Sequence, residues 1–147
     1  MARWRGLSVI VTAAILLAGC NAGLAISVGM KCSAQMTSSL GLAGTCHEEL
    51  DELTAEAKRN ISVQTVDVLP QVHLFINGEV QEGSFTFLVK DSSGKEVSQT
   101  ARPERALDMH VVTRLDGLNT IAFRLNPGAA GAKGIKYEVA FQCECLP

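Results

Sequence analysis

The sequence predicts a mainly β protein, an antiparallel sandwich of about seven short strands that one short α-helix precedes. Two observations predict this fold. After Asn60, apolar and polar residues alternate with a period of two, which is typical of strands that bury one face. Turn-forming residues interrupt the alternation at intervals of roughly ten residues, as expected between the strands of a sandwich.

Length and charge limit the classes of function. The chain of 147 residues has room for one domain of ordinary size and a targeting segment. Its formal net charge is −2, with 13 basic and 15 acidic residues, and Arg3 and Arg5 are the only charges before Lys31. No basic patch stands out, so nucleic acid is not an expected partner.

The N-terminus has the pattern of an export signal. The basic segment MARWR precedes an uncharged run from Gly6 to Met30, and this order is typical of a secretory signal peptide. Within the run, Leu17-Ala18-Gly19-Cys20 resembles the lipobox of bacterial lipoproteins. The resemblance covers only about the first 20 residues. It implies that the signal peptide, residues 1–19, is removed, and that Cys20 then carries a diacylglycerol and usually an N-acyl chain.

Lipidation of Cys20 would make the protein a membrane protein, because two or more acyl chains give a durable anchor. Enterobacterial lipoproteins retained in the inner membrane usually have Asp after this cysteine. Asn21 stands there instead, which favours the outer membrane in a cell with two membranes. Two alternatives remain. The apolar run could be an uncleaved membrane-spanning helix, or an ordinary signal peptidase could cleave after Ala25, where Gly23–Ala25 supply the small residues it requires. All three place the chain beyond about residue 30 outside the cytoplasm, because Arg3 and Arg5 hold the N-terminus inside.

Residues 20–44 are rich in small side chains and lack a clear period, so we expect a lipid-anchored spacer there, followed by the folded domain at 45–147. The domain begins with a capping box, in which the Thr45 hydroxyl and the Glu48 carboxylate can each accept a hydrogen bond from a backbone amide.

A short amphipathic helix is predicted from roughly Cys46 to Arg59. Its acidic residues come early and its basic residues come last, which complements the helix dipole. Leu50, Leu53 and Ala57 share one face at helical spacing, so the helix would pack against a partner surface.

The strands follow, separated by turns such as DSSGK, in which Gly94 can adopt positive φ. In the last strand, the odd-numbered residues from Ile135 to Cys145 are apolar or cysteine and point to one face. The strand rhythm resembles that of small Ig-like or GOLD-like modules of exported proteins, which implies a fold and no activity. The expected strands are ISVQTVDV, QVHLFING, SFTFLVK, KEVSQT, ALDMHVVT, NTIAFRL and GIKYEVAFQCEC.

Four cysteines remain when Cys20 is set aside: Cys32, Cys46, Cys143 and Cys145. An even number in an exported domain indicates two disulfides. A bridge between the last two would close a small, strained ring. We therefore expect crossed pairing, in which each bridge joins the N-terminal part to the last strand. Each would close a loop of about 100 residues and add about 4 kcal/mol in the chain-entropy model.

A metal site is the alternative use of the same thiols, since Cu(I) and Zn(II) favour thiolate ligands. It would make the protein a copper- or zinc-handling protein. An oxidising compartment favours disulfides over such a site. A redox-active CxC is also considered, although neither flank offers a helix N-terminus that would lower a thiol pKa. The ligands would come from the four cysteines, His47, Met30 and Met36.

The remaining candidates indicate no catalytic site. His73 and His110 lie on predicted strands and are expected at the surface, since no HxH or HExxH spacing is present. Neither a GxSxG nucleophile motif nor a pair of carboxylates suited to acid–base chemistry occurs. Asp91–Gly94 could bind calcium, but a hairpin turn has the same composition. We predict that the protein is not an enzyme and has no cofactor and no resident metal.

The sequence thus predicts a lipoprotein of the cell envelope that is anchored in a membrane and faces the periplasm or the exterior. Its disulfide-stapled sandwich would act as a binding or structural module, through a sheet face, an edge strand or the loops. An envelope protein is among the expected partners.

Overall fold

The computed structural model describes residues 25–26, 29–37, 41–67 and 70–144. These residues form nine strands, and they contain no helix and hence none that could span a membrane. The predicted mainly β, antiparallel architecture is confirmed, with nine strands in the described residues in place of about seven. The strands are β1 (Ala25–Ile26), β2 (Lys31–Met36), β3 (Leu42–Leu53), β4 (Ala57–Val63), β5 (Gln71–Glu79), β6 (Glu82–Lys90), β7 (Glu96–Ala101), β8 (Leu107–Arg114) and β9 (Thr120–Cys143).

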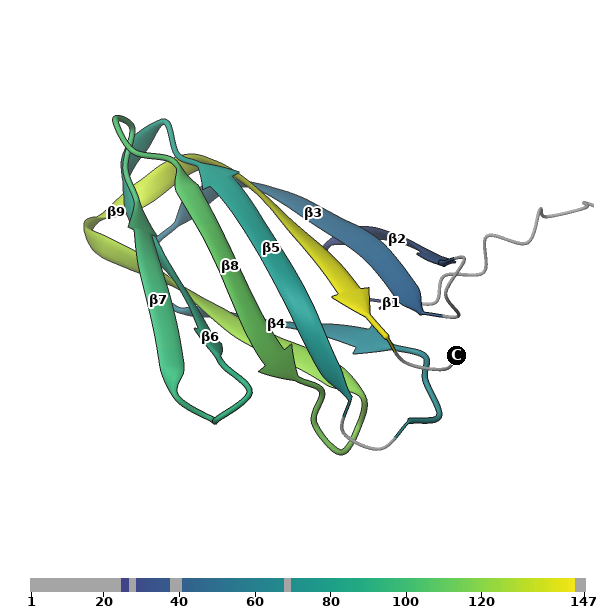
Figure 1. Ribbon diagram of the computed structural model, residues 1–147. Helices are drawn as coiled ribbons and strands as arrows, with labels where there is room; N and C mark the ends of the chain where they lie inside the picture. Colours follow the sequence, from purple (N-terminus) through teal and green to yellow (C-terminus); the bar gives the residue numbers. More distant parts are fainter. Residues whose placement is uncertain (1–24, 27–28, 38–40, 68–69, 145–147) are drawn as a thin grey trace, which may run out of the picture.

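The long strand β9 belongs to two layers. Its first half, residues 120–127, pairs with β4 and β6, and its second half, residues 132–143, pairs with β3 and β5. Layer 1 therefore has the order β2-β3-β9-β5-β8, and layer 2 has the order β1-β4-β9-β6-β7. In Figure 1 the yellow half of β9 lies between β3 and β5, and the yellow-green half lies beside β4.

Four connections cross between the layers at one end of the molecule, which we call the corner end: residues 54–56, 80–81, 102–106 and the bend of β9 at 128–131. Gly83 and Gly131 both have positive φ there. A Cβ atom on Gly83 would lie 2.1 Å from the carbonyl oxygen of Gly131, so this crossing requires glycine. The opposite end, the loop end, carries the β6–β7 and β8–β9 turns and the connection from β4 to β5.

The core lies between the two layers, where inward side chains from both meet. Phe87 and Phe123 of layer 2 stack with ring centroids 4.6 Å apart. Both meet the ring of Tyr137 in layer 1 edge-on, with centroids 6.2 and 6.1 Å away. Burial of such large apolar side chains is the main source of stability.

The predicted helix from Cys46 to Arg59 is wrong, because that segment forms most of β3 and the start of β4. β3 pairs with β2 on one side and with β9 on the other, so its backbone amides and carbonyls are satisfied by neighbouring strands. Cys46 and Glu48 point inward, as a period of two requires. Tertiary pairing has overridden a local pattern that also fits a helix.

The expected crossed disulfide pairing is also wrong, because Cys32 bonds to Cys46. These two cysteines lie directly opposite each other in the β2–β3 hairpin, an arrangement that a helix at 46–59 would have excluded. The bridge spans a sequence separation of 14 residues, which corresponds to about 3 kcal/mol in the chain-entropy model. Cys143 is also disulfide-bonded. Cys145 and the lipobox Cys20 lie outside the described residues.

Candidate functional site

The outer face of layer 1 displays its side chains in rows that the strand register sets. The central row runs across β3, β9, β5 and β8 and consists of Thr45, Ala140, Phe75 and His110. Small and large side chains therefore lie next to one another in this row. One neighbouring row holds Gln35, Ala43, Gln142, His73 and Val112, and the other holds Lys31, His47, Glu138, Asn77 and Asp108.

Phe75 and His110 form an exposed aromatic stack on this face, in which the two rings lie face to face. Their rings are stacked with centroids 4.6 Å apart and an interplanar angle of 1°. Phe75 is 42% exposed, which is unusual for a large apolar ring. The Nδ1 atom of His73 lies 3.2 Å from the Nε2 atom of His110, at hydrogen-bond distance, so one imidazole donates to the other. The stack and this hydrogen bond hold the His110 ring in place.

A shallow hollow of about 560 Å³ lies beside Phe75, over β2, β3 and β9. Its floor is smooth because Ala43, Gly44 and Ala140 carry little or no side chain. A Cβ atom on Gly44 would lie 2.5 Å from the ring of Phe141, so glycine is what allows that ring to pack under β3. The side chains of Gln35 and Gln142 supply neutral hydrogen-bonding groups at the hollow's side.

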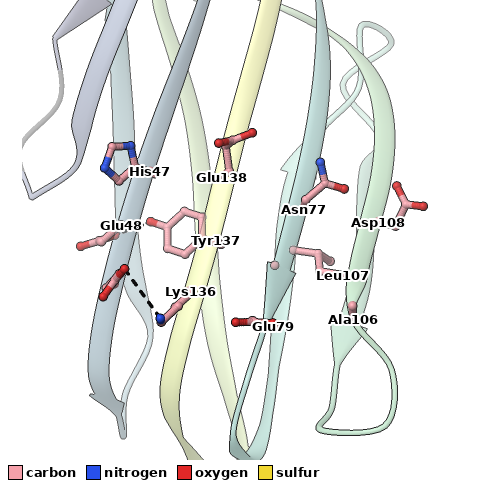
Figure 2. A pocket seen from close by; sticks show the side chains of 12 residues that line it. His47, Glu48, Asn77, Glu79, Ala106, Leu107, Asp108, Lys136, Tyr137 and Glu138 are labelled. Atoms are coloured by element: carbon pink, nitrogen blue, oxygen red, sulfur yellow. Dashed lines mark hydrogen bonds and ion pairs between the residues drawn. The ribbon is translucent and has the colours of Figure 1, made fainter.

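A second hollow of about 560 Å³ continues this face toward the corner end and is acidic (Figure 2). The outward carboxylates there come from β3, β5, β8 and β9, and one cation, Lys136, lies among them, 3.9 Å from Glu49. The excess of negative charge disfavours anionic ligands on this part of the face. The carboxylates are those of Glu49, Glu79, Asp108 and Glu138.

Glu48, Arg59 and Tyr137 form a polar cluster beneath the acidic hollow. The guanidinium of Arg59 donates from Nη2 to Glu48 Oε1 at 2.8 Å and from Nε to Oε2 at 2.9 Å, and the Tyr137 hydroxyl also donates to Oε2. The hydrogen bond from Arg59 to Glu48 raises the pKa of the guanidinium. Burial, followed by the hydrogen bond to Glu48, raises the pKa of Tyr137 far above its ordinary value. This cluster joins β3 and β9 of layer 1 to β4 of layer 2.

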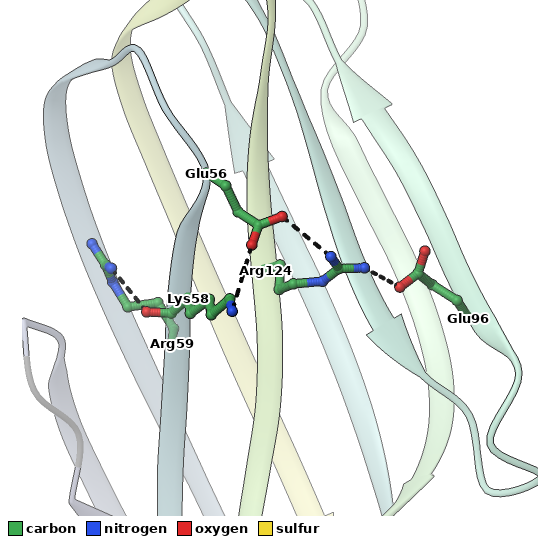
Figure 3. Close-up of polar contacts among 5 residues, drawn as sticks. All are labelled: Glu56, Lys58, Arg59, Glu96 and Arg124. Carbon is green, nitrogen blue, oxygen red and sulfur yellow. Dashed lines mark hydrogen bonds and ion pairs between the residues drawn. The ribbon is translucent and has the colours of Figure 1, made fainter.

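The outer face of layer 2 is occupied by ion pairs (Figure 3). Arg124 of β9 donates to Glu56 at 3.2 Å and to Glu96 of β7, and Lys58 lies 3.9 Å from Glu56. The hydrogen bond with Glu96 raises the pKa of Arg124. These charges neutralise one another and lie in solvent. Among the described residues of this face, no large apolar side chain is as exposed as Phe75.

Several candidates from the sequence have no metal-binding geometry. Cys32 and Cys46 are oxidised to a disulfide and are therefore not thiolate ligands. Among the described residues, no three His, Cys, Asp or Glu side chains converge on a metal position. Asp91 forms a turn, in which its Oδ1 atom accepts hydrogen bonds from the backbone amides of Ser93 and Lys95.

His73 and His110 are exposed, as predicted. The contact of His110 with Phe75, and of the two histidines with each other, was not predicted from the sequence. One signal was present in the sequence: Phe75 stands at an outward position of the alternation in QVHLFING, where a polar residue is expected.

No family model and no curated protein matches the chain. Similar solved structures include the CBM22-1 xylan-binding domain of Paenibacillus barcinonensis Xyn10C, with 11% identity, a TM-score of 0.37 and coverage of 84% of this chain and 87% of that one. A family 11 carbohydrate-binding module from Clostridium thermocellum has 12% identity, a TM-score of 0.36 and coverage of 83% and 88%.

The MgGH51 α-L-arabinofuranosidase has 10% identity, a TM-score of 0.39 and coverage of 82% of this chain, which spans 23% of that enzyme. Because the TM-scores are below 0.5, these similarities identify no ligand.

Proposed function

We propose that the protein is a non-enzymatic binding module of the cell envelope, held at a membrane through lipidated Cys20, and that the outer face of layer 1 binds a neutral saccharide. The observation that carries the proposal is the exposed stack of Phe75 and His110 beside a smooth, uncharged hollow.

The aromatic stack suits one face of a sugar ring. A pyranose presents C–H groups on its faces and hydroxyl groups around its edge, and ligand sites typically combine apolar surface with a few polar groups that fix orientation. His110 covers one face of the Phe75 ring, and the exposed remainder of the ring lines the hollow, where it offers an apolar surface to a ligand. The stack and the hydrogen bond to His73 hold His110, so little side-chain entropy would be lost on binding.

The polar groups around the stack suit hydroxyl groups and not anions. The side chains of Gln35, Gln142 and Thr45 can each donate and accept hydrogen bonds, as sugar hydroxyls do. The carboxylates of the acidic hollow can accept hydrogen bonds from further hydroxyls along an extended chain. They would repel phosphate, sulfate or uronate groups. We therefore infer a neutral oligosaccharide that runs along the strands' outer face from the stack toward the corner end.

Two observations support a location outside the cytoplasm. The Cys32–Cys46 bridge suits an oxidising compartment. The lipobox-like segment at Leu17–Cys20 indicates export and lipidation.

Calorimetric titration tests the ligand class. The panel is xylan, mannohexaose, β-1,4-galactotriose and a β-1,3-1,4-mixed-linked tetrasaccharide. We expect at least one to bind, and Phe75→Ala to weaken that binding at least tenfold because the stacking surface is lost. Leu88→Ala, on the outer face of layer 2, is the matched control and should bind normally. Binding of no member, or equal binding by Phe75→Ala, would contradict the proposal.

Metabolic labelling with an alkyne fatty acid tests the anchor separately. Wild type should be labelled and Cys20→Ser should not, because the thioether forms at that sulfur. Equal labelling of both would exclude Cys20 as the lipidated residue.

A further inference from the structure

The large exposed apolar side chains fall into two groups. Four such residues occur among those the structure describes, and Phe75 is the one on the aromatic stack. The other three lie at the loop end: Met36 at 50%, Val66 at 73% and Leu118 at 84% exposure. Single exposed apolar residues are ordinary, but three at the same end of a small domain form a pattern. Building on the proposed lipid anchor, we infer that the loop end rests on the bilayer and inserts Val66 and Leu118.

The two most exposed of these residues, Leu118 and Val66, lie on loops that hydrogen bonds stabilise. The Oδ1 atom of Asp116 accepts from the backbone amides of Leu118 and Thr120, each at 2.9 Å. The Asn119 side chain donates to the Thr65 carbonyl at 2.7 Å, which ties the loop of Leu118 to the loop of Val66. Asn119 itself has a φ of 56°, a conformation that favours Asn among side-chain-bearing residues. A turn that these hydrogen bonds stabilise therefore holds Leu118 in its exposed position.

The path of the chain places the anchor beside these loops. Ala25 of β1 pairs with Val63, whose backbone amide donates to the Asn119 carbonyl at 2.8 Å. Five residue steps separate Cys20 from Ala25, and an extended chain spans at most about 3.6 Å per residue. A lipid on Cys20 would thus keep Ala25 within about 18 Å of the lipid headgroups. The loop end is the part of the described domain that this tether holds nearest the membrane.

Acidic side chains outnumber basic ones at the loop end, so the attraction to lipid would be hydrophobic. The basic residues there include Lys95 and Arg114, and the acidic residues are Asp67, Asp91, Asp116 and Glu144. We therefore expect docking on zwitterionic lipid without a requirement for anionic lipid, and little weakening by salt.

Fluorescence quenching by brominated phosphatidylcholine tests the inference. The lipidated protein is reconstituted into phosphatidylcholine vesicles. The only natural tryptophan, Trp4, lies in the signal peptide that is removed before lipidation, so an introduced tryptophan is the only one in the mature chain. Leu118→Trp should be blue-shifted and strongly quenched by brominated lipid. Ala130→Trp, exposed at the corner end, is the matched control and should be quenched at least fivefold less. Equal quenching of the two probes, or none at Leu118→Trp, would overturn the inference.

Flotation separates this result from failure of the anchor. If wild type does not float with the vesicles, the anchor proposal and this inference both fail. If it floats but Leu118→Trp is not quenched, the anchor stands and the docking is wrong.

A blue shift of Leu118→Trp without vesicles, with a dimeric mass in light scattering, would overturn the inference in favour of a second copy of the chain. The double variant Leu118→Ser with Val66→Ser should still float with the vesicles, because the lipid on Cys20 still anchors it.

Discussion

At the residue scale, Tyr137 connects the aromatic core to the ion pair between the layers. Its ring contacts Phe87 and Phe123, and its hydroxyl donates to Glu48. Ionising this phenol in the folded state would place a negative charge in a buried site beside a carboxylate, so its pKa is raised, mainly by burial. Tyr137 is the only tyrosine of the chain, which makes its titration directly observable.

We predict that tyrosinate absorbance stays absent as the pH of the folded protein rises past 10, whereas the chain in concentrated urea titrates near the ordinary pKa of about 10. The unfolded chain then releases the phenol proton first. The free energy of unfolding should accordingly be unaffected by Tyr137 below about pH 10 and should fall above it, by at most about 1.4 kcal/mol per pH unit. Absorbance at 295 nm, with circular dichroism to monitor folding, measures both. Tyrosinate formation near pH 10 in folded protein would contradict the burial.

Glu48→Ala should lower the free energy of unfolding by about 3 kcal/mol, because it removes the acceptor of Arg59 and of the Tyr137 hydroxyl. The matched control is Glu49→Ala. Its side chain points outward and pairs loosely with Lys136 at 3.9 Å, so the change should stay within about 0.5 kcal/mol. Urea denaturation measures both, and similar losses in the two variants would show that the buried ion pair has no special role.

At the scale of elements, the β2–β3 hairpin and the bent strand β9 hold the sandwich together. The hairpin is cross-linked by Cys32 and Cys46. The bend at 128–131 lets β9 serve as the central strand of both layers. The bend of β9 depends on pairing with segments that are distant in sequence, and the disulfide depends on the register of the hairpin, so local propensity reveals neither feature.

Peptide mapping tests the hairpin bridge. Trypsin cleaves after Lys31 and Lys58, and no Lys or Arg lies between them. We expect peptide 32–58 alone, lighter than its reduced form by two hydrogens. A link between that peptide and the C-terminal peptide that disappears on reduction would instead show the crossed disulfide pairing. Removing the bridge with Cys32→Ala and Cys46→Ala together should cost about 3 kcal/mol.

Glycine substitutions test the corner end. Gly83→Ala should destabilise by more than about 2 kcal/mol, because positive φ is combined with a Cβ clash against the Gly131 carbonyl. Gly94→Ala has a similar φ but no atom within 4 Å of its Cβ, and should cost about 1 kcal/mol. Thermal unfolding measures the difference, and equal losses would argue against the tight crossing.

At the scale of the whole molecule, the sequence predicted the class of fold because alternation within a strand is a local property. It indicated which side chains of QVHLFING point inward, and the structure places Val72, Leu74 and Ile76 in the core. It failed at Cys46–Arg59, where the spacing of acids and leucines fits a helix equally well. The aromatic stack could not be predicted either. Phe75 and His110 meet only through the β5–β8 register, which depends on the complete sheet.

The two faces of the sandwich expose different side chains. Layer 2 exposes paired charges around Arg124, and layer 1 exposes the aromatic stack and an uncharged hollow. With the loop end on the membrane, the outer face of layer 1 would be roughly perpendicular to the bilayer surface. The acidic hollow, near the corner end, would then point away from the lipid.

The most direct test of the binding face is amide chemical-shift mapping with isotope-labelled protein and the four saccharides of the panel. We predict that at least one saccharide shifts the amides of Phe75, His110 and Ala140 and their row neighbours, and leaves those of Leu88 and Arg124 unchanged. Shifts confined to layer 2 or to the loop end, or no shifts with any of the four, would contradict the account.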